Sequence, residues 1–385
     1  MKIAILTSGI LPVPAVQGGA VENLTDILLA YNDQHHLHDI TVFSVYHPDI
    51  EGHQALQSKV NHYIFIHTSS LWYRLRAKLY GCLHRNECYY YALEFFFEQA
   101  YKRLSRQHYD LIILENRPGF AIKLAQRLST PIVSHIHTNQ VHEPIPQTFD
   151  IIKSTHRFLA VSQYIKDEIL SLGRPADVRI VYNGLDPDFS QAHHPVRRSA
   201  LGFGEDDFLA VFCGRLVPGK GIKELLQALL MLQNHPDIKL LVIGSSDFAN
   251  GTNQNDYIRE LHEMVSALGQ RVVFTGYVPY ADIPNYLSMA NVSVVPSRIK
   301  EAFGMTCIEA CAMGLPVIAT NDGGIPETLV GQKHILIDRG KPLPDQIADA
   351  LLRIKEHPDT YAGNALPPLF YKETFAKTFY QAIEN

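Results

Sequence analysis

The chain has 385 residues, of which 46% are hydrophobic and 19% are charged, and it carries a formal net charge of −5. This length exceeds what one ordinary core needs and suits two domains of similar size, while the composition excludes a disordered chain and a coiled coil. A slightly acidic chain also lacks the basic surface that nucleic acid requires, so we expect no nucleic-acid partner.

The first half alternates apolar, strand-like runs with helical patterns. The strand-like runs are residues 3–7, 40–44, 63–67, 111–114, 132–135, 158–161 and 178–182. The helical patterns are residues 21–29, 120–128 and 162–171. This alternation predicts a parallel sheet covered by helices on both faces.

The second half repeats the alternation. Its strand-like runs are residues 208–213, 238–243, 272–275, 292–296 and 316–320. Its helical patterns are residues 222–232, 255–268, 281–289 and 304–313. The predicted fold class is therefore α/β, with two Rossmann-like domains in tandem.

A stretch rich in turn-forming residues, 182–195, separates the two halves. We expect a first domain over residues 1–185, a linker over 186–198, a second domain over 199–367 and a C-terminal helix over 368–385 that packs on the first domain. Ligands of open parallel sheets bind beyond the carboxyl ends of the strands, so the site is expected in a cleft between the two sheets.

Three features of the sequence indicate the cellular compartment of the protein. The first apolar run is too short for a secretory signal, no stretch approaches the ~20 apolar residues of a membrane span, and the five cysteines form no C-x-x-C pair. We therefore expect a cytoplasmic protein with reduced thiols.

Paired glycines, Gly18 and Gly19, lie between the first strand and the helix that follows it. Glycine lets a ligand approach the backbone, and the unpaired amides at the start of a helix attract a phosphate or a sugar. We predict a ligand-facing surface here, although glycine pairs are also common in ordinary strand-to-helix turns.

The segment over residues 72–109 combines basic side chains with many aromatic ones. Two interpretations fit this composition. Its helices either pack their aromatic side chains inward with solvated basic faces, or they contact an anionic membrane or a lipid-linked acceptor.

Two histidines, His135 and His137, alternate at the carboxyl end of a predicted strand. Alternating histidines at this edge of a sheet favour contact with substrate, and a structural role for the rings is the alternative. No cysteine or carboxylate lies nearby at ligand spacing in the sequence, so we predict no zinc site.

An Asp-x-Asp pair, Asp186 and Asp188, occupies the predicted linker. Two carboxylates at this spacing can bind a divalent metal. The neighbouring Asn183, Gly184 and Pro187 instead favour a turn or a helix cap.

A glycine-rich basic loop follows the first strand of the second half, with Gly214, Arg215, Gly219, Lys220 and Gly221. The glycines bring the backbone close to a ligand, and the two cations are placed to meet a negatively charged leaving group. The spacing is not that of a Walker P-loop, because no serine or threonine follows the lysine.

The start of the predicted helix over residues 304–313 is built from Phe303, Gly304, Met305 and Thr306. Phe303, Gly304 and Met305 carry no side-chain base or nucleophile. Gly304 lets a ligand approach, and the first amides of the helix form an anion site suited to a diphosphate.

Two carboxylates, Glu301 and Glu309, lie eight positions apart around this helix start. Glu309 is about one turn into the helix, where it can accept both hydroxyls of a ribose. Glu301 stays in the preceding loop and can reach hydroxyls at the far end of the same ligand. Together they predict a clamp for a nucleotide sugar.

With these residues in place, the chain resembles the retaining GT-B glycosyltransferases of glycosyltransferase family 4 over essentially its whole length. The Glu301 and Glu309 pair with the Arg215 and Lys220 loop is the most specific match. Individually weaker matches are Gly18-Gly19, His137-Thr138, Asn183-Gly184-Leu185-Asp186 and Gly323-Gly324-Ile325-Pro326-Glu327.

The resemblance implies a GT-B fold, in which two Rossmann-like domains face each other across a cleft, the first binding the acceptor and the second the donor. It implies catalytic roles for His137, rather than His135, and for Arg215, Lys220 and Glu301. It implies donor binding by Gly18, Gly19, Gly214, Phe303, Gly304, Met305, Thr306 and Glu309.

Members of this family transfer with retention and without metal, so the resemblance implies no metal site and no cofactor besides the nucleotide-sugar co-substrate. A double-displacement glycosidase needs two carboxyl groups about 5 Å apart at one anomeric carbon. Glu301 and Glu309 are expected at opposite ends of the ligand, so we expect no covalent intermediate.

The expected function is transfer of a hexose or N-acetylhexosamine from a UDP-sugar to a glycan or lipid-linked acceptor in bacterial cell-surface polysaccharide synthesis. The expected location is the cytoplasm, at the inner face of the membrane. Residues 11–16 and 116–118 also resemble a subgroup of the family that contains bacterial polysaccharide transferases and spore-coat-associated members. The alternatives are therefore a coat- or envelope-associated structural protein with little transferase activity, or a sugar-nucleotide epimerase.

Overall fold

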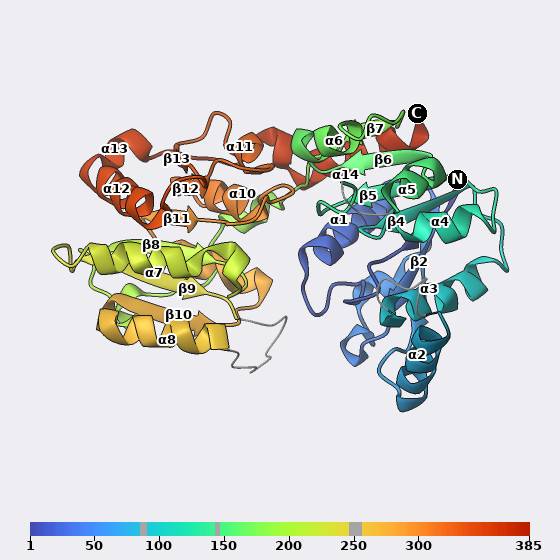
Figure 1. Cartoon of the computed structure of the whole chain (residues 1–385), viewed down its shortest axis with the longest axis horizontal. Coiled ribbons are helices and arrows are strands. Elements are labelled where there is room, and N and C mark those ends of the chain that lie inside the picture. Colours follow the sequence, from blue (N-terminus) through green and yellow to red (C-terminus); the bar gives the residue numbers. More distant parts are fainter. Residues whose placement is uncertain (85–90, 143–146, 246–255) are drawn as a thin grey trace. The chain divides into compact units, whose positions relative to one another are not determined.

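The computed structural model describes residues 1–84, 91–142, 147–245 and 256–385, and the side chains of residues 91 and 92 are outside this description. The chain forms two compact units. The N-terminal unit contains Met1–Tyr182 and Phe375–Asn385, and the C-terminal unit contains Asn183–Thr374 (Figure 1).

The N-terminal unit is built on a seven-stranded parallel sheet with the strand order β3-β2-β1-β4-β5-β6-β7. Its strands are β1 (Lys2–Leu6), β2 (Asp39–Val45), β3 (Asn61–Ile66), β4 (Leu111–Glu115), β5 (Ile132–Ile136), β6 (Arg157–Ala160) and β7 (Val178–Ile180). The central strands are buried almost throughout because helices cover both faces of the sheet, although β4 ends in Glu115 and β5 contains Ser134 and His135.

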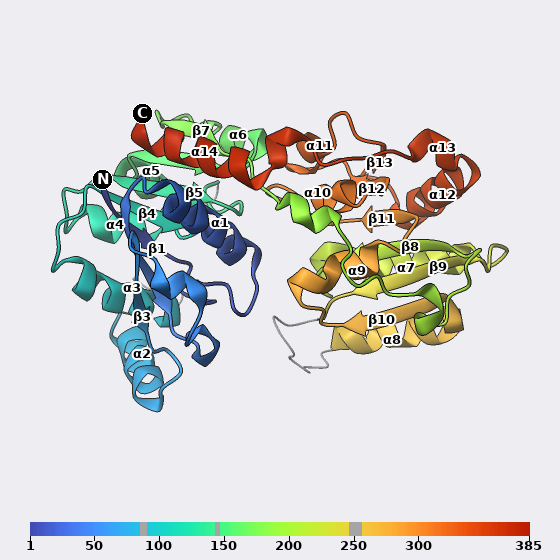
Figure 2. The same ribbon diagram turned by 180° about the vertical axis from the view of Figure 1, so that it is seen from behind.

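The helices of this unit are α1 (Ala20–His35), α2 (Leu71–Leu83), α3 (Tyr91–Leu104), α4 (Phe120–Ala125), α5 (Thr148–Ser154), α6 (Gln163–Leu170) and the C-terminal α14 (Lys372–Glu384). Helix α14 lies with the elements of this unit (Figure 2). Its aromatic side chains are buried in one core cluster with residues of strand β1 and helix α1, and the Tyr380 hydroxyl donates to the Leu28 carbonyl at 2.8 Å. The return of the C-terminal helix to the first domain is therefore confirmed.

This last helix begins later than predicted, at Lys372 and not at residue 368. Pro367 and Pro368 lead into a short 3₁₀ turn over Pro368–Phe370, and Tyr371 then pairs with Leu185 in an isolated parallel bridge. Extended pairing at Tyr371 is incompatible with a continuous helix from residue 368.

The C-terminal unit repeats the plan with a six-stranded parallel sheet in the order β10-β9-β8-β11-β12-β13. Its strands are β8 (Phe208–Cys213), β9 (Ile238–Ile243), β10 (Val272–Gly276), β11 (Val292–Val295), β12 (Val317–Thr320) and β13 (His334–Ile337). Its helices are α7 (Ile222–Met231), α8 (Asp256–Leu268), α9 (Ile283–Leu287), α10 (Met305–Ala312), α11 (Ile325–Thr328), α12 (Leu343–Glu356) and α13 (Pro358–Tyr361). The two predicted Rossmann-like sheets are confirmed.

The predicted linker, residues 186–198, belongs to the C-terminal unit. Asp186 caps a 3₁₀ turn over Pro187–Ser190, where its carboxylate accepts from the Asp188 amide at 3.1 Å and pairs with Lys372 at 2.6 Å. Asp188 pairs with His193 instead. The cap interpretation of the Asp-x-Asp pair therefore fits these contacts better than a shared metal.

The basic and aromatic segment divides into two different helices. In α3 the rings of Phe96 and Phe97 are fully buried, whereas α2 leaves most of its large apolar side chains exposed. Tyr89 and Tyr90 lie outside the described residues. No helix of the described ranges is both long enough and apolar enough to cross a bilayer.

Candidate active site

The strand order of the C-terminal unit reverses between β8 and β11, so the loops that follow these two strands leave the sheet in opposite directions. Ligands of open α/β sheets bind at such a switch point, beyond the carboxyl ends of the strands. The loop after β8 carries Arg215 and Lys220, and the loop after β11 carries Glu301. The sheet itself therefore brings together groups that are far apart in the sequence.

The two loops are packed backbone to backbone. Gly221 has φ +75°, and a Cβ at this position would collide with the carbonyl oxygen of Pro296. The carbonyl of Gly219 accepts from the Arg298 amide at 2.8 Å and from the Ser297 hydroxyl at 3.2 Å. The glycines of the basic loop thus allow a close approach of the neighbouring loop, in addition to any ligand.

Lys220 and Glu301 form an ion pair, with Nζ to Oε1 at 2.7 Å. Both side chains are mostly buried, at 27% and 17% exposed, and the Ser297 hydroxyl donates to the same carboxylate oxygen. The carboxylate of Glu301 therefore orients the ammonium that was predicted to meet the diphosphate. Arg215 lies on the same loop with an exposed side chain.

The backbone of Glu301 is also held by the neighbouring loop that contains Gly323 and Gly324. The Gly324 amide donates to the Glu301 carbonyl at 2.8 Å, and Gly323 and Gly324 pass so close to residues 301–303 that any side chain would clash with the backbone. The Gly323-Gly324-Ile325-Pro326-Glu327 motif thus supports the loop that presents Glu301.

Helix α10 begins at Met305, one residue after the predicted start, with Gly304 as the N-cap at φ +113° and no side chain capping its amides. The first amides of an α-helix lack partners within the helix and carry partial positive charge. The Phe303 side chain is buried and packs edge-to-face on Phe370 at 5.6 Å between ring centroids. Phe303 therefore offers a ligand its backbone, as expected for an anion site made of amides.

Glu309 lies one turn into α10 and is 5% exposed. The Tyr280 hydroxyl donates to its Oε1 at 3.1 Å. Burial raises the pKa of Glu309 to about 7, against the opposing effects of the Tyr280 hydrogen bond and the Lys220 charge. A buried carboxylate in this position can accept ribose hydroxyls, and its charge depends on pH in the neutral range.

In the N-terminal unit, Gly18 and Gly19 lie directly before α1, and Gly19 is the N-cap of that helix. The first turn holds Glu22, which is buried and accepts from the Ser8 hydroxyl at 2.9 Å. Burial raises the pKa of Glu22. The glycine pair is thus placed at a helix start as predicted, but a carboxyl group that the sequence analysis did not single out lies beside it.

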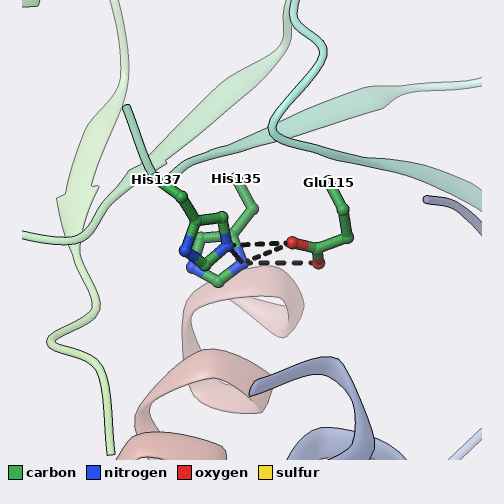
Figure 3. Close-up of side chains that lie close together, drawn as sticks. All are labelled: Glu115, His135 and His137. Carbon is green, nitrogen blue, oxygen red and sulfur yellow. Dashed lines mark hydrogen bonds and ion pairs between the residues drawn. The ribbon is translucent and has the colours of Figure 1, made fainter. Parts of the chain in front are cut away.

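His135 and His137 converge on a third residue, Glu115, which ends the neighbouring strand β4 (Figure 3). The Glu115 Oε2 atom lies 3.1 Å from His135 Nδ1 and 3.0 Å from His137 Nε2, and the two ring nitrogens are 3.1 Å apart. No carboxylate lies at ligand spacing from these histidines in the sequence, yet Glu115 lies beside them in the fold. The carboxylate comes from the adjacent strand of the sheet, which sequence spacing did not reveal.

The protonation state of this cluster follows from its burial. Burial acts to raise the pKa of Glu115, but the charges and hydrogen bonds of the two histidines outweigh it and hold the pKa at about 2. Burial and the neighbouring His135 lower the pKa of His137 to about 4. At neutral pH the ionised Glu115 carboxylate therefore accepts from the neutral imidazole N–H of His137.

The three ligand atoms lie within 4.8 Å of one another, which is close enough to hold a cation. A metal would take the lone pairs of His135 Nδ1 and His137 Nε2 and place protons on His135 Nε2 and His137 Nδ1. Both of these outer nitrogens are buried without a hydrogen-bond partner in the described structure. Metal-bound histidines almost always donate their second N–H, so the cluster fits a hydrogen-bonded network better than a metal centre.

The two histidines differ in burial. His135 is 0% exposed and contacts the rings of Phe375 and Phe379 in α14, so it is a core residue. His137 is 8% exposed, and its Nδ1 atom is a lone-pair acceptor without a partner. Both rings therefore carry an unsatisfied outer nitrogen in the described structure, and His137 is the more exposed of the two.

Four further residues contact the predicted site residues but were missed in the sequence: Ser297, Tyr280, Glu22 and Glu115. The Ser297 hydroxyl donates to Glu301, and the Tyr280 hydroxyl donates to Glu309. Only Glu115 carried a usable signal, as an acidic residue that ends an apolar run immediately before the predicted sheet edge. Of the other three, Ser297 and Tyr280 are ordinary polar residues in a loop and a turn, and Glu22 is an acidic residue in the first turn of α1.

Comparison with known proteins gives two family matches. The model for Glycosyl transferases group 1 matches residues 195–363, and the model for Glycosyltransferase Family 4 matches residues 34–189. Spore coat protein SA of Bacillus subtilis is similar, with 29% identity over 367 residues that cover 91% of this chain and 89% of that protein. The lipopolysaccharide 1,2-N-acetylglucosaminetransferase of Salmonella typhimurium is 26% identical over 228 residues, 58% of each chain.

Among solved structures, Anabaena Alr3699/HepE in complex with UDP and glucose is similar, with a TM-score of 0.74 and 22% identity over the whole of both chains. At this identity the likeness concerns the fold. The two family models together match most of the chain, and both units have the Rossmann-like sheet of a GT-B enzyme. The protein is therefore a GT-B glycosyltransferase that belongs to the glycosyl transferases of group 1 and family 4.

Proposed function

We propose that this glycosyltransferase transfers a hexose or N-acetylhexosamine from a UDP-sugar to a glycan or lipid-linked acceptor, with retention of configuration and without a metal. The observation that carries the proposal is the Lys220–Glu301 pair beside the start of α10. The ion pair supplies a cation and a hydroxyl acceptor, and the helix start supplies free amides, all at one switch point of the sheet. The structure of HepE with UDP and glucose favours UDP as the nucleotide. Other relatives are GDP-mannose-dependent, so a GDP-sugar is the alternative donor.

In the proposed mechanism the diphosphate lies at the N-terminus of α10, where the amides of Met305 and Thr306 and the cations Arg215 and Lys220 stabilise it as it leaves. Glu309 accepts the ribose hydroxyls, and Glu301 accepts hydroxyls of the donor sugar. These contacts fix the donor so that the interactions with the diphosphate strengthen as the glycosidic bond breaks.

Neither glutamate is suited to be a nucleophile. Glu301 is neutralised by Lys220 and Glu309 is tied to Tyr280 one turn inside a helix. The acceptor hydroxyl is therefore proposed to attack from the face that the leaving diphosphate occupies. In this scheme His137 contributes the unpartnered Nδ1 as a hydrogen-bond acceptor for a substrate hydroxyl, while Gly18, Gly19 and Gly214 provide close backbone approach.

Two other functions compete with this proposal. The relative named spore coat protein SA favours a coat-associated protein that keeps the fold, and a sugar-nucleotide epimerase would alter the sugar without an acceptor. Incubation with UDP-, GDP- and ADP-sugars and a panel of acceptors separates the three. Acceptor-dependent release of UDP supports the transferase, a changed sugar without acceptor supports the epimerase, and no turnover with any pair supports the coat protein. A donor at 100 times its Kd should also add roughly 2.7 kcal/mol to the free energy of unfolding.

The proposal also includes the setting of the reaction. We infer that the protein works in the cytoplasm, at the inner face of the membrane, in the synthesis of cell-surface polysaccharide. The support is the lipopolysaccharide and phosphatidylinositol monomannoside transferases among its relatives, whose names describe envelope glycans and glycolipids.

The affinity for UDP should rise with pH through neutrality. Ribose hydroxyls donate to the ionised form of Glu309, whose pKa is about 7 in the free protein. Between pH 6 and pH 8 the ionised fraction grows about tenfold, and UDP should bind about tenfold more tightly if only this form binds. Calorimetric titration at several pH values measures the change.

The matched control for this titration is Glu309→Gln. The phosphate of UDP titrates in the same pH range, and its contribution is common to both proteins. Only the difference between wild type and variant reports on Glu309. A pH profile that is identical in the two proteins would contradict the ribose contact.

Removal of divalent metal should leave the transfer rate unchanged, because the leaving diphosphate is stabilised by side-chain cations and helix amides. The measurement is turnover after dialysis against EDTA, compared with turnover after addition of Mg²⁺ or Mn²⁺. Loss of activity that is restored by metal would contradict this mechanism. Asp188→Asn and Glu115→Gln would then identify which acidic site binds the ion.

A further inference from the structure

Helix α2 carries an apolar stripe on the surface of the N-terminal unit. Its members are Leu71, Trp72, Leu75, Leu79 and Leu83, which are 71%, 75%, 52%, 60% and 73% exposed. At 100° per residue they fall within about 120° of the helix circumference, so they form one continuous face. Soluble proteins rarely expose several large apolar side chains side by side, and such a face usually marks an interaction surface.

The opposite face of α2 is packed against the protein. Ala77 is buried, and the rings of Tyr73 and Tyr80 contact Phe95 of α3 at 4.9 and 5.8 Å between centroids. The Ser70 side chain caps the helix by accepting from the Tyr73 amide at 3.2 Å. The helix is therefore held by its tyrosine side, and the leucine stripe points outward as a consequence of this packing.

Three cations border the stripe. Arg74 and Lys78 project along one margin and Arg76 along the other, and all three are exposed. Helix α2 contains no acidic residue, although the whole chain has a net charge of −5. None of the three forms an ion pair with another residue of the described ranges. The helix therefore combines an apolar centre with unneutralised positive margins.

We propose that α2 lies in the interface of an anionic membrane, with the leucines and Trp72 inserted among the acyl chains and the three cations at the lipid headgroups. This is the arrangement of interfacial amphipathic helices, whose long basic side chains extend to the headgroups. The proposal deepens the proposed function and rests on it in one respect only: a membrane surface is where a lipid-linked acceptor would be met.

The charges argue against a second copy of the chain as the occupant. A symmetric contact through this stripe would bring the same three cations of two molecules together, and like charges across an interface oppose association. An anionic bilayer satisfies both features at once, because it accepts apolar side chains and attracts the cations.

The experiment uses the intact protein and its intrinsic fluorescence, because Trp72 is the only tryptophan of the chain. Vesicles of phosphatidylcholine with roughly one third phosphatidylglycerol should shift the Trp72 emission to shorter wavelength, and brominated acyl chains should quench it. Vesicles of phosphatidylcholine alone should bind at least tenfold more weakly. Added salt should weaken the binding to anionic vesicles.

Two variants test the two features separately. Leu75→Gln with Leu79→Gln should weaken vesicle binding at least tenfold, and Arg74→Gln with Arg76→Gln and Lys78→Gln should weaken it about fivefold per cation. The control is Leu37→Gln with Leu170→Gln, which changes two exposed leucines of the same unit outside α2 and should bind like wild type. Turnover of a water-soluble acceptor should be unaffected in all three proteins.

Several results would overturn the proposal. One is an unchanged Trp72 emission with anionic vesicles, and another is an equal loss of binding in the control. A third is an emission shift that depends on protein concentration without lipid and accompanies a dimer mass in light scattering, which would assign the stripe to a second copy. Vesicle binding requires no turnover, so its failure would leave the proposed transferase function intact.

Discussion

Replacing Lys220 with alanine should lower the rate of transfer by at least about 100-fold, on the order of 3 kcal/mol in the activation barrier. The ammonium of Lys220 is held by Glu301 at 2.7 Å beside the start of α10, where negative charge accumulates as the diphosphate leaves. Binding of UDP should also weaken, by roughly tenfold, because the same contact exists in the product complex. Steady-state turnover and calorimetric titration with UDP measure the two effects.

The matched control is Lys223→Ala. Lys223 is three residues further along the chain, is 34% exposed, and pairs with Glu260 on the surface. Surface ion pairs contribute little to stability, and this one is not in contact with the switch-point groups, so turnover and UDP binding should stay within about twofold of wild type. Near-normal turnover in Lys220→Ala, or an equal loss in Lys223→Ala, would contradict the assignment of the leaving-group cation.

Strands β1 to β12 were predictable because each contains a short apolar run, whereas β13 (His334–Ile337) was not predicted. The order of the strands was not predictable, since the central position of β8 and β11 depends on pairing between segments that are far apart. The contact between Lys220 and Glu301, 81 residues apart, follows from that order. Sequence motifs therefore identified both residues, and only the sheet explains why they meet.

The histidine cluster shows the same limit of sequence-based prediction. Sequence spacing argued against a carboxylate near His135, but Glu115 lies opposite it in the register of two parallel strands. A residue twenty positions away becomes an adjacent side chain once β4 and β5 pair. Local spacing predicts contacts along one strand or helix, and it does not predict contacts across strands.

The basic and aromatic segment posed a different problem. Its two helices have similar compositions, yet Phe96 and Phe97 of α3 fill the core while the leucines of α2 remain outside. Helix α3 packs on one face of the sheet, and α2 packs on α3. Which helix takes that place is decided by packing, so the sequence supported both interpretations.

Replacing Glu301 with glutamine should also lower transfer by at least about 100-fold, for a different reason. The neutral amide keeps the shape of the side chain and can still accept from Ser297, but it is a weaker acceptor for the hydroxyls of the donor sugar. Because UDP lacks the sugar, its affinity should be unchanged or higher, since Lys220 no longer has a competing anion. Titration with UDP and turnover with the UDP-sugar measure these two quantities, and Glu260→Gln is the matched control.

The direction of the UDP effect separates two roles for Glu301. If it grips the sugar, the losses in turnover of Lys220→Ala and Glu301→Gln arise from different parts of the donor and combine substantially in the double variant. If it serves only to orient Lys220, Glu301→Gln should weaken UDP binding as Lys220→Ala does, and the double variant should be no slower than Lys220→Ala alone. The ion pair makes some coupling certain, because each residue is the other's nearest charge. A complete absence of additivity would therefore assign sugar recognition to another residue. Partial additivity would mean that Lys220 and Glu301 together contact both sides of the breaking glycosidic bond, the diphosphate and the sugar.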